Sequence, residues 1–173
     1  MKKLMILAAV LIFGLAAQAQ RIGVVDTDYI LDNMPEYRVA QEQLDDLAVE
    51  WQKEIEQLFS NIDELYQKFV AEAPILPEEE KRRRQEQIER LEREAKELQR
   101  KRFGRDGDLF KKRQELIQPI QERVYNAIQE IADNENYLII LDKSAGTAVA
   151  YARSRVDISD DVLRRLGYAP GGM

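Results

Sequence analysis

The stretch Ala73-Pro74-Ile75-Leu76-Pro77 separates two long amphipathic helical patterns and decides how this chain folds. Proline has no backbone N–H and fits poorly inside a helix. The first helix is therefore expected to end before Pro74 and the second to begin after Pro77. Because two helices joined by so short a connection run antiparallel, the sequence predicts a helical hairpin over residues 36–135 with its tip near 73–77.

Apolar residues on both sides of this turn recur at spacings of three and four, which is typical of a coiled-coil seam. They are Ala40, Leu44, Leu47, Trp51, Ile55, Leu58, Ile62, Leu65 and Phe69 before the turn, and Ile88, Leu91, Ala95 and Leu98 after it. Antiparallel pairing about Ile75 places Ile62 opposite Ile88 and Trp51 opposite Leu98. The agreement of two stripes read separately supports the hairpin.

The second helical pattern is longer than the first and contains helix-breaking residues. Gly104 and Gly107 predict a kink or a close approach between helices, and Pro119 predicts a bend. The apolar stripe continues beyond the glycines as Phe110, Ile117, Val124 and Ile131.

Short apolar segments at the two ends of the chain predict a small β body, formed by residues 20–35 and 136–173. Three segments have the length and composition of strands, namely Arg21–Asp26, Tyr137–Leu141 and Thr147–Ala152. Ser159 is a candidate N-cap for a terminal helix that Gly167 ends. The predicted fold class is α+β, with a long antiparallel α-helical hairpin on a β body made from both termini.

Residues 1–19 have the pattern of a signal peptide. Lys2 and Lys3 precede the apolar run Leu4–Leu15, which is too short to span a bilayer and leads to Ala17-Gln18-Ala19. We expect cleavage near Ala19 and export of the mature chain. A retained membrane anchor is the alternative interpretation of the same residues.

Composition argues against catalysis and against nucleic-acid binding. The chain has no Cys and no His, so it lacks disulfides and both the commonest general base and the commonest metal ligand. No cofactor or metal is expected, and an enzyme is disfavoured. The formal charge is −6, and loss of the two positive charges of Lys2 and Lys3 makes it −8. An acidic chain is a poor partner for nucleic acid. Because Glu36–Glu72 holds most of this negative charge, the two helices of the hairpin are expected to attract each other.

Asp26-Thr27-Asp28 follows an apolar strand, as do the nucleophilic and acidic aspartates of some phosphotransfer enzymes. Asp142 follows the second strand in the same way. The simpler interpretation is that these aspartates occupy turns and caps, where Asp is favoured in any case.

Two surface features of the hairpin are candidates for binding. Lys81, Arg82, Arg83 and Arg84 form a basic run near the tip that suits anionic lipid headgroups. The simpler interpretation is a solvated face with i,i+4 pairs such as Glu78–Arg82 and Glu86–Arg90. The second feature is an apolar stripe off the main seam, which with the turn forms an exposed adhesive surface made of Phe59, Tyr66, Val70, Ile75 and Leu76.

Taken in order, these segments resemble the Skp (OmpH-like) family of periplasmic outer-membrane-protein chaperones. The resemblance rests on the signal peptide, RIGVVDTDYIL (21–31), the proline-interrupted hairpin, YLIILDKSAGTAVAYA (137–152) and DISDDVLRRLG (157–167). The segment FGRDGDLFKKRQELIQPIQ (103–121) is similar to one found in a branch of that family.

The resemblance implies a homotrimer with a shared β-barrel-like core, in which helical arms enclose a cavity. Family members hold unfolded outer-membrane proteins in this cavity without ATP. The implied oligomer body would include Ile22, Val24, Leu138, Ile140, Val149 and Tyr151. Unlike the basic family members, this chain is acidic, so transient contact with an anionic membrane is expected only from the basic run. A coiled-coil structural adaptor of the cell envelope is the alternative function.

Overall fold

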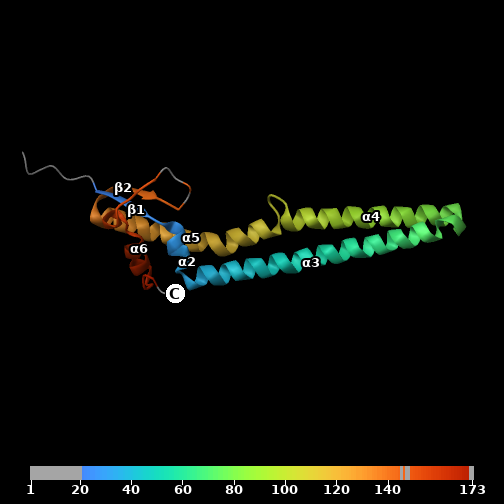
Figure 1. Cartoon of the computed structure of the whole chain (residues 1–173), viewed down its shortest axis with the longest axis horizontal. Helices are drawn as coiled ribbons and strands as arrows, with labels where there is room; N and C mark the ends of the chain where they lie inside the picture. Colours follow the sequence, from blue (N-terminus) through green and yellow to red (C-terminus); the bar gives the residue numbers. More distant parts are fainter. Residues whose placement is uncertain (1–20, 145, 147–148, 172–173) are drawn as a thin grey trace, which may run out of the picture. The chain divides into compact units, whose positions relative to one another are not determined.

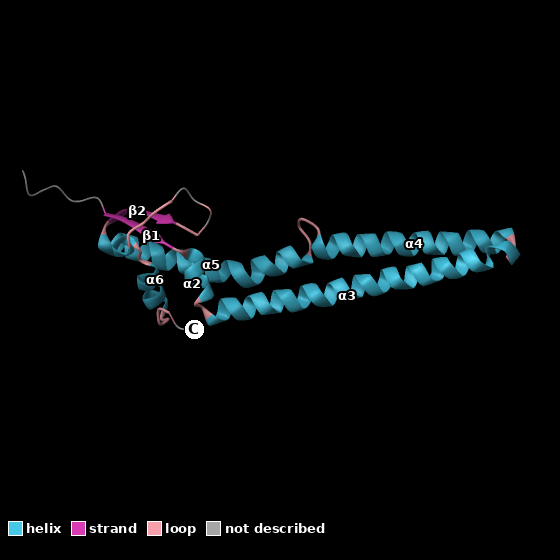
Figure 2. Cartoon of the chain, viewed as in Figure 1, coloured by secondary structure: helices cyan, strands magenta, loops and turns pink. Residues whose placement is uncertain are grey.

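The computed structural model describes residues 21–144, 146 and 149–171. The expected signal peptide, residues 1–19, lies outside the described residues. The chain divides into two compact units, a body that includes residues 21–33 and 123–171, and a hairpin formed by residues 34–122. Both strands belong to the body, whereas the hairpin contains only helices and loops (Figure 2).

The hairpin begins with the long helix α3, Pro35–Glu72, whose first residue is a proline. Proline suits this position because the first N–H groups of a helix have no partner within the helix. A 3-10 turn η2, Ala73–Ile75, and Leu76-Pro77 connect α3 to α4, Glu78–Phe103. The helices α3 and α4 lie side by side (Figure 1). The predicted turn at 73–77 and the end of the first helix at Glu72 are therefore confirmed.

The predicted seam joins α3 to α4. Ile62, Ile88 and Ala95 form a buried cluster, and four partly buried side chains pack against it, namely Leu58, Phe59, Phe69 and Leu91. The placement of Phe59 off the seam was wrong, because its side chain packs against this cluster. The ring of Trp51 stacks edge-on against Phe103 with ring centroids 6.5 Å apart. Its aromatic partner therefore lies beyond Leu98, the residue predicted to face it.

The glycine pair interrupts the second helix completely. Helix α4 ends at Phe103 and α5, Asp108–Glu135, begins after four intervening residues. An added Cβ on Gly107 would lie 2.8 Å from the carbonyl oxygens of Lys101 and Arg102, so only glycine fits without a shift. Pro119 lies inside α5, which continues through it. In the predicted stripe along α5, Phe110 is exposed, whereas Ile117, Val124 and Ile131 are buried.

The body contains a two-stranded parallel sheet. Strand β1, Arg21–Val25, pairs with β2, Tyr137–Asp142, so the two ends of the chain share one sheet as predicted. Helix α2, Thr27–Asp32, follows β1 and packs against α6, Ser159–Leu166. A short 3-10 turn η3, Ser154–Val156, precedes α6. The buried side chains of these segments include Val24, Val25, Ile30, Leu31, Ile158, Val162 and Leu163.

Two predictions for the C-terminal segment were wrong. Of the expected third strand, Thr147 and Ala148 lie outside the described residues, and residues 149–152 belong to no strand. A strand needs a neighbouring backbone to pair with, and the described part of this single chain gives this segment none. Ser159 is the first residue of α6 rather than its N-cap, and its hydroxyl accepts a hydrogen bond from the backbone N–H of Asp26 at 2.9 Å. Gly167 ends α6, as predicted, and its backbone is in the left-handed conformation.

Candidate functional site

Exposed apolar side chains gather on the part of the hairpin near its turn. Tyr66 and Val70, four residues apart on one face of α3, are each 50% exposed, and Ile75 in the turn is 85% exposed. Leu76 is half-buried. Tyr66, Val70 and Ile75 therefore retain the exposure that an adhesive surface requires, and we call them the distal apolar patch. Phe59 does not belong to it because it packs in the seam.

The basic run at the start of α4 is paired with carboxylates. Lys81 binds Glu78 at 2.6 Å, Arg82 lies 3.9 Å from Glu86, and Arg83 lies 2.8 Å from Glu80. These pairs replace the predicted Glu78–Arg82 and Glu86–Arg90 pairs, since Arg90 pairs with Glu94. The run is therefore largely neutralised by its own helix. This finding favours the interpretation as a solvated face.

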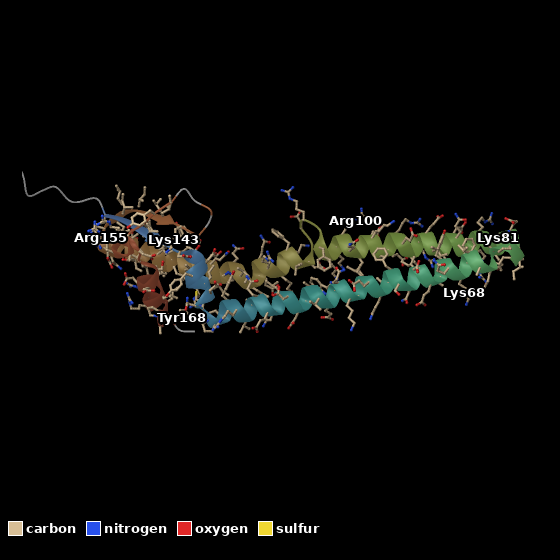
Figure 3. All side chains as sticks on the ribbon, viewed as in Figure 1. Lys68, Lys81, Arg100, Lys143, Arg155 and Tyr168 are labelled. Atoms are coloured by element: carbon tan, nitrogen blue, oxygen red, sulfur yellow. The ribbon has the colours of Figure 1, made fainter. Side chains whose placement is uncertain are left out.

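Arg84 pairs with a residue on the other helix. Its guanidinium donates to the carboxylate of Glu72 at the end of α3, and this hydrogen bond lowers the pKa of Glu72. Beside this pair lies a shallow depression of about 160 Å³, lined by Leu65, Lys68, Arg84, Gln87 and Ile88. Lys68 and Lys81 both lie near the closed end of the hairpin (Figure 3). The depression is too small for a drug-sized ligand, since such pockets measure about 300–1,000 Å³.

Most of the acidic side chains of α3 are exposed to solvent. Among the described residues, the ion pairs between α3 and α4 are Arg84–Glu72 and Arg102–Glu54. Several other carboxylates of α3 are exposed, such as Glu42, Asp46 and Glu50. Few of the charges therefore contribute to the expected attraction between the helices. The main contact between α3 and α4 is the packing of apolar side chains in the seam.

The body carries a second exposed apolar surface on its strands. Ile22 and Leu138 are exposed, and Tyr151 is 81% exposed, whereas Ile140 and Val149 are half-buried. Val24 is only 4% exposed and belongs to the core of the body itself. Ile139 and Leu141 are also exposed. The apolar segment YLIIL indicated their presence but not their exposure, because a parallel strand has no clear alternation between its two faces.

The aspartates that follow the strands occupy caps and turns. The side chain of Asp26 accepts a hydrogen bond from the backbone N–H of Tyr29 at 3.0 Å and thereby caps α2. Asp142 accepts hydrogen bonds from Thr27 Oγ1 at 2.6 Å and from Ser144 Oγ at 2.9 Å. Lys143 lies 2.8 Å from Asp157 and 3.5 Å from Asp26. These contacts support the interpretation as caps over the phosphotransfer alternative.

Asp142 and Asp157, together with their partners Thr27, Lys143, Ser144 and Ser159, form a polar cluster that we call the Asp142 junction. Hydrogen bonds control the ionisation of its two carboxylates. Burial acts to raise the pKa of Asp142, but hydrogen bonds from Thr27 and Ser144 outweigh it, so the pKa lies below its usual value. In the same way, burial acts against ionisation of Asp157, but Lys143 and Ser159 lower its pKa. The hydrogen bond to Asp157 raises the pKa of Lys143. Both carboxylates are therefore held in the ionised form that a structural role requires.

The described residues include no group of three or more acidic, His or Cys side chains placed to hold a metal ion. Within the same residues, none of the helices combines the length and apolar character needed to cross a membrane. The arrangement is that of a helical hairpin and a small parallel-stranded body, each of which has exposed apolar side chains.

Comparison with known proteins identifies the class to which this architecture belongs. The family model for OmpH-like outer membrane proteins matches residues 21–166. The chain therefore belongs to the OmpH-like family. No curated protein sequence matches it.

A solved structure supports the fold. The crystal structure of a Caulobacter crescentus protein, described as a candidate outer membrane chaperone (OmpH-like), superposes with a TM-score of 0.68. The match covers 87% of this chain and 86% of that protein at 11% sequence identity. At this low sequence identity, the similarity shows the fold alone.

Proposed function

We propose that this protein is a periplasmic holdase chaperone that binds unfolded outer-membrane proteins without ATP and prevents their aggregation. The observation that carries the proposal is the distal apolar patch, in which Tyr66, Val70 and Ile75 are exposed near the turn of the hairpin. Membership in the OmpH-like family supports a chaperone role. The use of the aspartates as caps and the lack of His favour a protein that is not an enzyme.

The binding mode follows from the size of the exposed groups. Each apolar side chain buries a small area against an unfolded chain, worth about 1.5–3 kcal/mol at most. Several weak contacts within one assembly together give a higher affinity, because the first contact raises the effective concentration of the client for the others. A homotrimer would triple the number of patches. In the proposed assembly, the exposed Ile22, Leu138, Ile139, Leu141 and Tyr151 of the body form contacts between copies.

The surrounding carboxylates fit the same function. Exposed Glu42, Asp46 and Glu50 keep the hairpin hydrated and net negative, which opposes association between loaded complexes. Contact of the paired basic run with an anionic membrane would be weak, because Lys81, Arg82 and Arg83 each have a carboxylate partner.

The test is suppression of aggregation. A denatured outer-membrane β-barrel is diluted from urea into buffer with and without the mature protein, in the absence of nucleotide, and light scattering is followed. We expect scattering to fall as the protein approaches one assembly per client. Unchanged scattering at a stoichiometric ratio would contradict the proposal and leave the adaptor function as the better explanation.

A further inference from the structure

The break between α4 and α5 affects only one of the two helices of the hairpin. Residues 104–107, which we call the break segment, separate Phe103 from Asp108, whereas α3 is continuous from Pro35 to Glu72. The break segment is held by backbone hydrogen bonds from Gly104 N to Arg100 O at 2.8 Å and from Gly107 N to Gly104 O at 2.9 Å. Glycine-containing segments of this kind have more backbone freedom than a helix.

One side chain contacts helices on both sides of the break segment. Arg102, in the last turn of α4, pairs with Asp108 Oδ2 at 2.9 Å and so connects α4 directly to the first residue of α5. The same guanidinium lies 3.5 Å from Glu54 on α3. Its central carbon lies 4.5 Å from the centroid of the Trp51 ring, also on α3. Arg102 therefore joins three helical segments.

The burial of Arg102 shows that this position is specific. Its Nε is buried and has no hydrogen-bond partner among the described residues, which is unfavourable for a polar group. The side chain occupies this position because its other groups make an aromatic stack and two ion pairs. A planar guanidinium can make these contacts together, whereas the ammonium of lysine cannot stack in the same way.

We propose that Arg102 is a positioning residue. Its contacts connect the helices on the two sides of the break segment and fix the angle between α4 and α5. With Arg102 in place, both sides of the break segment are fixed to α3 and to each other. Without it, α4 and α5 lose this side-chain connection, and the break segment becomes a hinge. The stiffness of the hairpin at this point therefore depends on one side chain, independently of what the hairpin binds.

The test uses distances between spin labels, which the absence of Cys in the natural chain makes straightforward. One pair spans the break segment, with cysteines introduced at the exposed residues Glu97 and Gln114. A control pair lies within α4, at the exposed residues Glu79 and Glu97. Pulsed electron resonance gives the distribution of distances for each pair in the full-length mature protein.

We expect a narrow distribution for both pairs in the parent protein. Arg102→Gln should broaden or shift the distribution across the break segment and leave the pair within α4 unchanged. Arg102→Lys should give an intermediate result, because it keeps the charge and loses the stack. The matched control is Arg100→Gln, since the side chain of Arg100 is exposed and forms no ion pair within the described part of the chain. That variant should behave as the parent.

Trp51 supplies a second readout, because it is the only tryptophan of the chain. Loss of the Arg102 stack should shift its emission and increase quenching by acrylamide. An unchanged distribution across the break segment in Arg102→Gln would overturn the proposal. Broadening of both label pairs would also overturn it, since Arg102 would then stabilise α4 itself rather than the angle between α4 and α5.

Discussion

Ile22 of β1 lies opposite Ile139 of β2 in a parallel sheet, although the whole helical hairpin separates them in sequence. Two parallel strands need a long crossover connection, and here the helices α3, α4 and α5 lie between them in the chain. The sheet therefore cannot form from local contacts. Substitutions that prevent the close approach of β1 and β2 should destabilise the body.

Gly23→Val tests this approach. An added Cβ on Gly23 would lie 3.2 Å from the Tyr137 ring and 3.3 Å from Ile140, and valine adds two further methyl groups. We expect the free energy of unfolding to fall by about 1–3 kcal/mol, the usual cost of overpacking. Urea denaturation followed by circular dichroism measures it. Tyr125→Ala is the control, because this side chain of the body is exposed and should change stability by less than about 0.5 kcal/mol.

Ile62→Ala tests the seam of the hairpin. Ile62 is buried in the cluster with Ile88 and Ala95, so its truncation should cost about 2–5 kcal/mol. Val49→Ala, on the same helix, removes an exposed side chain and should have almost no effect. A comparison of the two denaturation midpoints gives the result. Equal midpoints would show that the seam does not stabilise the hairpin.

The sequence predicted the hairpin well because the signals that define it are local. Pro74 and Pro77 mark helix ends by their covalent structure, and the helix bounds at Glu72 and Glu78 follow. The stripes gave the register near Ile62 and Ile88. The contact of Trp51 with Phe103 was not predicted, because Phe103 lies beyond the last residue of the Ile88–Leu98 stripe.

The candidate surfaces were harder to predict, because exposure depends on contacts far apart in sequence. Phe59 and Tyr66 share a seven-residue spacing, but only Tyr66 remains exposed. Ser159 fits the N-cap pattern, but its hydroxyl is used by Asp26 and Asp157, residues whose positions depend on the fold of the body. The described part of the expected third strand finds no partner strand in one chain. A pattern within one segment does not contain this information.

The distal apolar patch should determine client binding if the protein is a holdase. Replacing Tyr66, Val70 and Ile75 together with Ser should weaken suppression of aggregation, while the melting temperature stays nearly constant because these side chains are exposed. Replacing the same residues with Leu should preserve activity, since contacts with an unfolded chain do not need a specific shape.

The control for that experiment is the double variant Val39→Ser and Val49→Ser. Both residues are exposed on α3 outside the distal apolar patch. This variant should protect clients as well as the parent protein does. Equal loss of protection in the control and in the patch variant would show that general surface hydrophobicity, rather than this patch, drives binding.

The exposed strand residues of the body should determine assembly. Leu138→Asp and Ile139→Asp place charges on side chains that are exposed in the single chain, so the body itself should tolerate them. If these residues meet another copy, buried unpaired charge will disfavour that contact. Multi-angle light scattering should then show a smaller species than the parent. An unchanged mass would exclude this surface from the interface.

The Asp142 junction should make the stability of the body depend on pH. The pKa of Asp142 is lowered in the folded protein, so the folded state binds fewer protons than the unfolded state at mildly acidic pH. The stabilisation that ionised Asp142 gives to the folded state is therefore complete above the pKa of the unfolded state, about 3.9. It is lost as pH falls through the pKa of the folded state. At pH 7, Asp142→Asn should cost about 1–3 kcal/mol through weakened hydrogen bonds from Thr27 and Ser144.

Denaturation of the parent and of Asp142→Asn at a series of pH values checks this sign. The difference in free energy of unfolding should be constant near neutral pH and should shrink once pH falls below about 4. Asp28→Asn is a suitable control because Asp28 is exposed on α2 and lies outside the junction. A difference that stays the same down to strongly acidic pH would mean that Asp142 stabilises the body through its shape rather than through its charge.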